Sequence, residues 1–288
     1  MLQLTVAGVA LGSVYALVAI GFVIIYRATG AVNFAHGDMV TVGAFAALWA
    51  TTVLEVPTLV SWLVAVLMLG VLGMLTYRFV YRPLRHHPFL AVAIATLGLA
   101  FVFRGVLFVI FGPQPAALPS PVGGGAVAIG DVVVSRHLLL IIGVTAVLII
   151  SQALFFRHTF LGKSLRATAE NQEVARMLGL RTNRIILWTF AYGAGLAAIA
   201  GVLLAPVRFV TLDLGFGVLL KAIVGAIVGG FGSLPGALVG GLIVGLAEVF
   251  GASLISSAFR DTFAFSILII ILLVRPHGLF QVKAEEKV

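Results

Sequence analysis

Residues 4–26 read LTVAGVALGSVYALVAIGFVIIY, an apolar run without a charged side chain. A helix needs about 20 such residues to cross the roughly 30 Å hydrocarbon core of a bilayer. The run starts close to the first residue and no basic segment precedes it. We therefore expect a first membrane-spanning helix and not a cleavable signal peptide.

The composition of the whole chain is that of a membrane protein. Of its 288 residues, 61% are hydrophobic and 10% are charged, and the mean hydropathy is +1.20. An ordinary soluble domain is about 25% charged. The net charge of +8 does not indicate nucleic-acid binding, because the basic residues lie in the gaps between apolar runs. The absence of cysteine excludes a disulfide framework, a zinc–cysteine site and a thiol nucleophile.

Further apolar runs predict an all-α, polytopic helix bundle of eight or nine spans, forming a single domain over residues 1–288. Two runs are short for a full crossing and predict either broken helices or helices with partly polar ends. The seven long runs are 4–26, 37–54, 58–80, 89–111, 137–156, 185–205 and 235–256, and the short ones are 218–231 and 262–274.

The basic residues predict which side of the membrane each loop occupies. Arg27, the stretches 77–87 and 157–184, and the tail from 275 hold most of the lysines and arginines. Threading the runs with the N-terminus outside places these four groups on one side, which the positive-inside rule makes cytoplasmic. We therefore expect a multi-pass membrane protein surrounded by lipid.

The longest exterior loop is 112–136. Its prolines and glycines exclude a helix. Two β-branched runs between Val127 and Val134, interrupted by Gly130-Asp131, predict a small hairpin. The loop is either a solvated connector or a docking surface.

The interior loop 157–184 is too charged to lie in lipid, yet Ala169 to Leu178 has the pattern of a short amphipathic helix, with Gly179 as its C-cap. Three apolar residues share one face of this helix: Val174, Met177 and Leu178. An apolar stripe facing water is unfavourable, so we expect a cover. The cover is either the protein's own helix ends and lipid headgroups, or a groove on a separate cytoplasmic protein.

The sequence contains no enzyme motif. Gly162-Lys163-Ser164 resembles the end of a phosphate-binding loop, but that motif needs a glycine at position 157, where the chain has arginine. His86 and His87 lack further ligands at the spacing of a metal site. We expect no catalytic residue, no metal and no cofactor on this chain, so any ATP and Mg²⁺ are used by another polypeptide.

Three charged residues fall inside predicted spans, where each costs about 2.5–3.5 kcal/mol at the bilayer centre. They are Arg104, Lys221 and Glu248. Glu248 would neutralise either Lys221 or Arg104 in a structural salt bridge. The alternative is that these charges act in solute passage.

Glycines four residues apart predict close helix packing in lipid. These pairs are Gly8/Gly12, Gly225/Gly229, Gly236/Gly240 and Gly241/Gly245.

Two glycine-rich stretches, 29–38 and 225–236, predict helix breaks. At an offset of 195, the matching positions are Gly30 with Gly225, Ala31 with Ala226 and Gly37 with Gly232. Repeats with breaks at equivalent places are how many transporters form their pathway. Gly232 and Ser233 are therefore candidate pathway residues, and Asp38 and Ser233 are candidate N-caps of the helices that follow.

Six short motifs follow one another along nearly the whole chain. They are Gly12 to Leu17 (GSVYAL), Asn33 to Gly37 (NFAHG), Lys163 to Ala167 (KSLRA), Ala175 to Gly179 (ARMLG), Gly229 to Gly236 (GGFGSLPG) and Arg275 to Leu279 (RPHGL). Each is weak alone, but in this order they resemble the LivH-type permeases of branched-chain amino acid ABC importers. His277 departs from that family, which often has a small polar residue there.

The resemblance implies the permease subunit of an importer of branched-chain or similar small amino acids in a bacterial cytoplasmic (inner) membrane. Its implied partners are a second, homologous permease, two cytoplasmic ABC ATPase subunits and an extracytoplasmic solute-binding protein. It implies a coupling helix that docks on an ATPase and contains Glu173, Ala175, Arg176 and Gly179. It also implies a helix break near the pathway that contains Asn33, Phe34 and His36.

The resemblance leaves the substrate open, because similar permeases carry urea, amides or other amino acids. A second interpretation is a stand-alone secondary transporter or channel. It would need ion-coupling carboxylates near the midplane, and only Glu248 is close. A third, an intramembrane enzyme, lacks a catalytic set.

Overall fold

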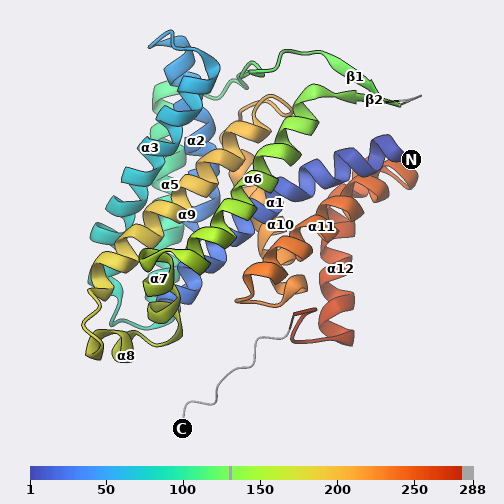
Figure 1. Ribbon diagram of the computed structural model, residues 1–288. Helices are drawn as coiled ribbons and strands as arrows, with labels where there is room; N and C mark the ends of the chain where they lie inside the picture. Colours follow the sequence, from blue (N-terminus) through green and yellow to red (C-terminus); the bar gives the residue numbers. More distant parts are fainter. Residues whose placement is uncertain (130–131, 281–288) are drawn as a thin grey trace.

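The computed structural model describes residues 1–129 and 132–280, and most of them are helical. Figure 1 shows one bundle of long helices with a thin β-hairpin at one end. Each of the nine predicted runs lies in a helix of this bundle. These helices are α1 (Leu2–Thr29), α2 (Ala35–Thr52), α3 (Thr58–Thr76), α5 (Phe89–Phe111), α6 (Arg136–His158), α9 (Thr182–Leu204), α10 (Leu214–Gly229), α11 (Leu234–Leu254) and α12 (Arg260–Val274).

The remaining elements are short. They are a π-helical turn η1 (Tyr77–Tyr81) and α4 (Arg82–Leu84), which extend α3, then α7 (Phe160–Glu170), α8 (Gln172–Met177) and the 3₁₀ turn η2 (Ser257–Phe259). The hairpin predicted in the exterior loop is confirmed: β1 (Ala126–Ile129) pairs with β2 (Val132–Ser135) in antiparallel register. Its predicted turn, Gly130-Asp131, lies outside the described residues.

Seven helical segments of the described chain are long and apolar enough to cross a membrane. The two bundle helices outside this group are α2 and α10. The first turn of α2 is polar, with His36 and Asp38, and α10 has only 16 residues. At about 1.5 Å per residue, α10 is about 24 Å long, short of the hydrocarbon core. The prediction of an all-α polytopic bundle is confirmed, and seven of its nine long helices have both the length and the hydropathy of a full crossing.

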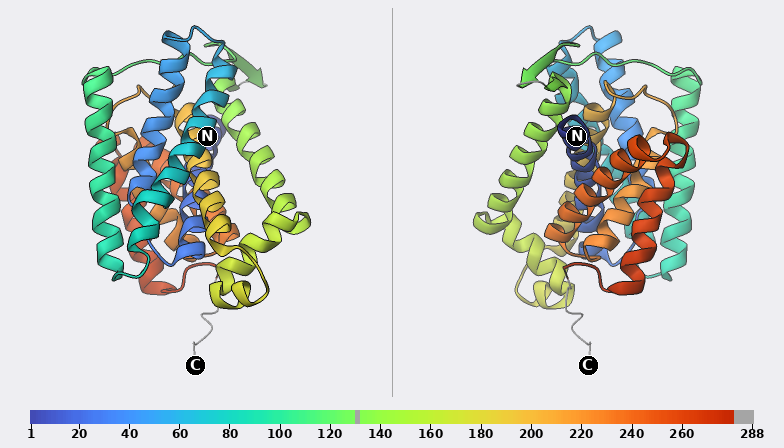
Figure 2. Two further views of the ribbon diagram at one scale, coloured as in Figure 1. Left: turned by 90° about the vertical axis from the view of Figure 1, so that its left-hand side faces the viewer. Right: turned by 90° about the vertical axis from the view of Figure 1, so that its right-hand side faces the viewer.

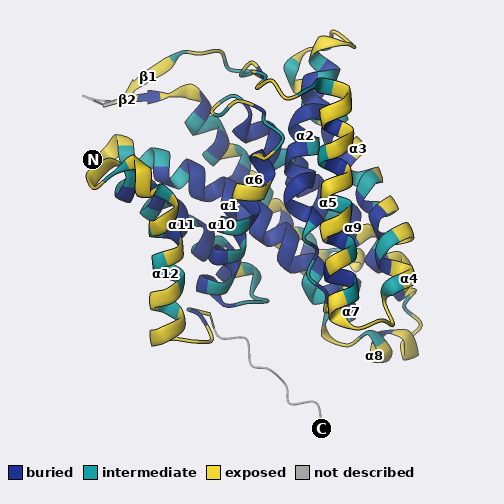
Figure 3. Ribbon diagram, turned by 180° about the vertical axis from the view of Figure 1, so that it is seen from behind, coloured by how far each residue is buried: buried dark blue, intermediate teal, exposed yellow. Residues whose placement is uncertain are grey.

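Burial separates a central helix from a lipid-facing rim. In the most apolar window of α1, 89% of residues are buried, against 6% in the segment Ser257–Val274. Figure 3 shows this contrast between α1 and α12. Large apolar side chains such as Leu90, Ile94 and Phe101 project outward from α5. Because their helix satisfies its own backbone hydrogen bonds, lipid solvates this rim at no polar cost.

The predicted glycine pairs pack helix against helix. On α1, a Cβ at Gly12 would lie 2.8 Å from the Cα of Leu242, and on α11 a Cβ at Gly245 would lie 2.2 Å from the amide nitrogen of Gly12. Gly229 and Gly236 bring α10 and α11 together in the same way, with a Cβ at Gly229 only 1.8 Å from the carbonyl oxygen of Gly236. Such contacts allow the backbones to approach closely, which stabilises bundles in lipid.

The predicted cytoplasmic segments gather at one end of the bundle. The Arg85 guanidinium donates to Asn183 Oδ1 at 2.9 Å, joining 77–87 to 157–184, and Gln172 Nε2 donates to the carbonyl of Ala28 at 2.6 Å. At the opposite end, Ala116 and Val210 form a β-bridge between two predicted exterior loops. Figure 2 shows α7 and the hairpin at these opposite ends. The predicted basic residues Lys283 and Lys287 lie outside the described residues.

The two glycine-rich stretches do break the helices, but not at the offset of 195. Gly225 and Gly37 lie inside α10 and α2. The helices end instead at Gly30 and Gly230, both with positive φ (69° and 111°), an offset of 200. The sequence match was wrong because at 225 and 37 the missing Cβ allows helix packing, whereas at 30 and 230 it allows a left-handed turn.

Candidate functional site

The segment 157–184, predicted to be cytoplasmic, contains two helices where the sequence predicted one. Asn171 separates α7 from α8, and its Oδ1 accepts hydrogen bonds from the amides of Glu173 and Val174 at 2.9 and 3.1 Å. A side chain that caps two free amides in this way starts a new helix. The predicted helix from Ala169 to Leu178 is therefore wrong at its start.

The end of α8 agrees with the sequence. Gly179 has φ +81°, and its amide donates to the carbonyl of Arg176 at 2.9 Å, while the amide of Leu180 donates to the carbonyl of Ala175 at 3.0 Å. These two bonds form a Schellman motif, which satisfies carbonyls that a helix end leaves free. The glycine C-cap is confirmed.

The apolar stripe of α8 is uncovered in this chain: Val174 is 48% exposed, Met177 85% and Leu178 73%. The opposite face is fixed to the bundle, because Ala175 is buried and Arg176 Nε donates to Thr182 Oγ1 at 3.0 Å. The helix is thus held rigidly with its apolar side outward.

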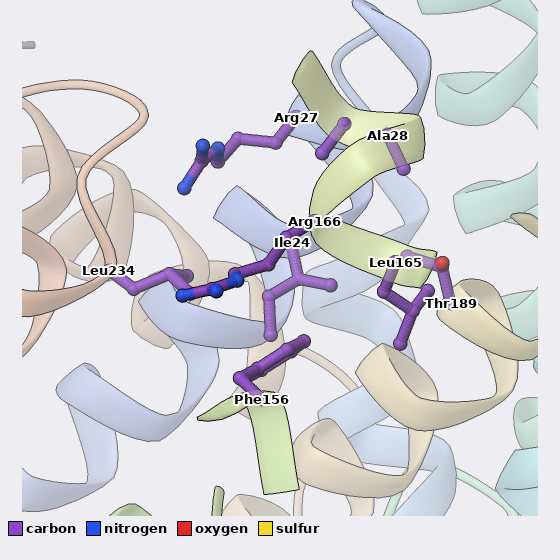
Figure 4. A pocket seen from close by; sticks show the side chains of 9 residues that line it. Ile24, Arg27, Ala28, Phe156, Leu165, Arg166, Thr189 and Leu234 are labelled. Carbon is purple, nitrogen blue, oxygen red and sulfur yellow. The ribbon is translucent and has the colours of Figure 1, made fainter. Parts of the chain in front are cut away.

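A small pocket of about 20 Å³ lies behind this segment, between the inner ends of α1, α6, α7, α9 and α11. In Figure 4, Arg27 and Arg166 extend along one side of it, and Leu165 and Thr189 lie on the other. Within residues 1–129 and 132–280, neither arginine forms an ion pair.

At the first helix break, the predicted residues are buried. Asn33 Oδ1 accepts from the amide of Ala35 at 3.1 Å, and the amide of Phe34 donates to Thr96 Oγ1 at 3.2 Å. Asn33 Nδ2 and both ring nitrogens of His36 are buried without a hydrogen-bond partner among the described residues. Helix α2 begins after Phe34 without a side-chain cap, and Asp38 lies inside its first turn. The predicted Asp38 cap is wrong.

At the second break, the predicted cap is confirmed. Ser233 Oγ accepts from the amide of Gly236 at 3.0 Å. The RPHGL motif closes this break from the far end of the chain: the amides of Leu279 and Phe280 donate to the carbonyls of Val228 and Gly229 at 3.0 and 2.8 Å. The segment after α12 therefore supplies the C-terminal cap of α10.

Aromatic rings connect the two breaks. Phe22 of α1 lies 6.4 Å from His36 and 6.1 Å from Phe231, measured between ring centroids. The breaks are therefore neighbours across α1, although Asn33 and Ser233 make no hydrogen bond to each other.

One of the predicted intramembrane salt bridges is present. We call its surroundings the Glu248 cluster. Glu248 is fully buried; its carboxylate accepts from Lys221 Nζ at 2.9 Å and from Tyr15 Oη at 2.6 Å. The guanidinium groups of Arg208 and Arg260 also contact it, and Lys221 Nζ lies 2.7 Å from Asp261 Oδ1.

Arg104 does not pair with Glu248, so that alternative is wrong. It belongs to a second group, the Arg104 cluster of Asp38, Arg104 and Asp213. Arg104 Nε lies 2.5 Å from Asp38 Oδ1 and Nη2 lies 3.3 Å from Asp38 Oδ2, while Nη1 lies 3.3 Å from Asp213 Oδ1. The Asp38 side chain is 1% exposed and the Asp213 side chain 82%.

The sequence analysis did not predict several members of these clusters, because only charged residues inside the apolar runs were taken as candidates. Arg208 and Asp213 lie in the link between α9 and α10, and Arg260 and Asp261 are the first two residues of α12. Tyr15 resembles any aromatic of an apolar helix. Opposite charges close to helix ends were the available signal. In the described part of the chain, no three His, Asp or Glu side chains come close enough to hold a metal ion.

Comparison with known proteins gives consistent relatives. Residues 4–273 match the family model described as "Branched-chain amino acid transport system / permease component". The chain is 36% identical to the high-affinity branched-chain amino acid transport system permease protein BraD of Pseudomonas aeruginosa, over 100% of this chain and 98% of that one. It is 33% identical to LivH of Escherichia coli (strain K12), a permease protein of the same description, over 100% and 97%.

A solved structure, PsaBC from Streptococcus pneumoniae in complex with Fab, matches with a TM-score of 0.50 and 14% identity, over 94% of this chain and 91% of that one. At this identity the likeness concerns the fold alone.

Proposed function

The chain belongs to the branched-chain amino acid transport permease family, and from this membership we propose that it imports branched-chain or similar small amino acids across a bacterial cytoplasmic membrane. It is a multi-pass membrane protein and a permease subunit of an ABC importer, hence one component of a larger system. The remaining components we propose are a second, homologous permease, two ATPase subunits that use ATP and Mg²⁺, and an extracytoplasmic solute-binding protein.

The observation that carries the proposal is the uncovered stripe of α8. A helix of six residues cannot hold its shape alone, and here its N-cap, its Schellman motif and its buried Ala175 hold it in place. Holding Met177 and Leu178 outward has no advantage in water. It is the arrangement of a helix that fills a groove on a partner. We propose a cytoplasmic ATPase subunit as that partner.

The contacts behind α8 give the route by which such a partner would act. Gln172 binds the carbonyl of Ala28 at the end of α1, and Arg176 binds Thr182 at the start of α9. A displacement of α8 would therefore reach the inner ends of the two most buried long helices, next to the first break. In this proposal, Glu173 and Gly179 face the ATPase, and Ala175 and Arg176 fix the helix to the bundle.

The substrate proposal rests on the relatives and on the character of the bundle. BraD and LivH belong to branched-chain amino acid transport systems by their descriptions. The bundle is largely apolar, which favours a solute with an aliphatic side chain. Uptake of leucine in preference to urea by the reconstituted system would support this choice.

The absence of cysteine allows a direct test of the partner. Met177→Cys should form a disulfide with a cysteine placed in the docking groove of an ATPase subunit. Val207→Cys, which is also exposed but follows α9 at the opposite end, is the matched control and should not crosslink.

A second measurement concerns coupling. Met177→Asp with Leu178→Asp should abolish leucine uptake and the solute-dependent rise in ATP hydrolysis, while the permease still inserts. Leucine uptake by the isolated chain in liposomes without ATPase subunits would contradict the proposal and favour a secondary transporter.

A further inference from the structure

The N-terminal ends of α2 and α10 lie side by side. A Cβ at Gly215 would lie 1.9 Å from the carbonyl oxygen of Gly37, and the amide of Gly215 donates to Thr41 Oγ1 at 2.8 Å. Both helices therefore begin at the same place within the bundle. Helix starts inside a membrane expose free amides and partial positive charge, and in transporters they often face solute.

Arg104 lies at the same level. It is the sixteenth residue of α5, about 22 Å from that helix's inner end at 1.5 Å per residue. Charged side chains at such a depth face the bundle interior or a water-filled cavity and mark substrate pathways. Arg104 therefore lies within a membrane-spanning helix, whereas its partner Asp213 lies in the link just before α10.

The two carboxylates of the cluster differ in their freedom. Asp38 is buried and contacts Arg104 through both oxygens, so it neutralises the guanidinium and fixes its direction. Asp213 is mostly exposed and makes one long contact, 3.3 Å, to Nη1. An exposed pair of this kind is weak. The contact between Asp213 and Arg104 Nη1 can therefore break, and each group can bind a new partner, without exposing a buried side chain.

Beside this pair lies an apolar surface. Arg104 stands over the ring of Phe216, 5.0 Å from its centroid, and this phenylalanine is exposed. From Phe216, a partly open stripe continues along α10 through Leu220 and Ile223. The guanidinium of Arg104, the carboxylate of Asp213 and the apolar stripe of α10 therefore lie next to one another.

We propose that Arg104 and Asp213 form a solute subsite for the charged ends of a zwitterionic amino acid. Asp213 binds the ammonium group, the Nη1 edge of Arg104 binds the carboxylate, and the α10 stripe accepts the aliphatic side chain. Asp38 is a positioning residue that holds the guanidinium. This inference rests on the proposed function and narrows its substrate class.

The test is ATP-driven leucine uptake by the whole reconstituted importer at saturating solute-binding protein, so that delivery does not limit the rate. Asp213→Asn should lower the maximal rate tenfold or more, and Asp213→Glu should restore part of it. Asp261→Asn is the matched control: Asp261 is also exposed and also paired with one cation, Lys221, but lies outside the subsite. Its rate should stay within twofold of the unaltered importer.

The outcomes separate the two proposals. Equal rates for Asp213→Asn and Asp261→Asn, in an importer that takes up leucine, would overturn the subsite alone. Uptake of urea and no leucine by the unaltered importer would overturn both the subsite and the proposed substrate. Arg104→Lys should also slow leucine uptake, because a lysine keeps the charge but cannot present two edges to two carboxylates.

Discussion

The Glu248 cluster and the Arg104 cluster are both built on a buried carboxylate, yet they are saturated to different degrees. Glu248 has four partners: a tyrosine hydroxyl and three cations. Asp38 has one, Arg104. Glu248 is fully buried, accepts three hydrogen bonds and has a further cation at 3.5 Å, whereas the Arg104 cluster leaves Asp213 exposed with one long contact. The comparison indicates what separates a structural ion-pair cluster from a binding site. It is the number of charged groups that still lack a full set of partners, rather than the number of charges.

The elements joined by each cluster support that distinction. The Glu248 cluster ties α1, α10, α11, the link after α9 and the start of α12. The Arg104 cluster ties α2, α5 and the start of α10. Because α10 belongs to both, solute binding at one end of this helix acts on a helix that the Glu248 cluster holds firmly.

The most severe change is the removal of Glu248. Glu248→Ala would leave Lys221, 6% exposed, beside two arginines without their shared counter-charge. Removing one partner of a buried pair costs about 3–5 kcal/mol. We expect little assembled importer and a large drop in its melting temperature, measured by fluorescence-detected size exclusion.

The control for this prediction is Asp261→Asn, which removes an exposed carboxylate from the same lysine. It should change stability by no more than about 1 kcal/mol. Equal losses for the two variants would mean that Glu248 is not the joint and would remove the contrast between the clusters.

A smaller effect is expected where α10 meets α2. A methyl group at Gly215 would overlap the carbonyl of Gly37, so Gly215→Ala must push the helix starts apart. Overpacking of this kind costs about 1–3 kcal/mol, and it should move Asp213 away from Arg104. We expect a lower melting temperature together with slower leucine uptake.

The next glycine along α10 provides the control. A Cβ at Gly217 would meet nothing within 4 Å, so Gly217→Ala should be neutral or stabilising by up to about 1 kcal/mol through helix propensity. If Gly215→Ala lost stability but imported leucine at the normal rate, the position of Asp213 would not matter to transport.

Much of the fold could be predicted from the sequence, because lipid imposes one rule on every span. Apolar runs predicted all nine bundle helices, and basic loops predicted which ends lie together. Small residues predicted the contacts of α1 with α11. Each of these inferences uses a property of a single segment, which a sequence displays directly.

The candidate site was harder to predict, because it depends on which residues meet. Asp38 has the residue type of an N-cap, but α2 begins at Ala35, so Asp38 lies inside the first turn and its carboxylate reaches Arg104 of α5. Arg104 is therefore paired with Asp38, and Glu248 pairs instead with Lys221, with Arg208 of the link after α9 and with Arg260 at the start of α12. Neither choice follows from spacing along one helix. The same limit applies to the breaks, where glycines that pack and glycines that turn look alike.

The finest difference between the clusters concerns the hydroxyl of Tyr15. It donates to Glu248 Oε2 at 2.6 Å, and its ring lies 5.8 Å from Lys221 Nζ. Tyr15→Phe removes only the donor and keeps the ring, so Glu248 retains its three cations. A hydrogen bond to a charged group contributes about 1.5–3 kcal/mol, and the remaining cations should keep the loss of stability at the lower end of this range.

Tyr192→Phe is the control, since Tyr192 stacks on Phe155 and its hydroxyl has no hydrogen-bond partner among the described residues. We expect Tyr15→Phe to lower the melting temperature by a few degrees, Tyr192→Phe to leave it unchanged, and both to import leucine at the normal rate. Slower import by Tyr15→Phe at full stability would mean that the Glu248 cluster also contacts the solute, and saturation would then no longer distinguish the two clusters.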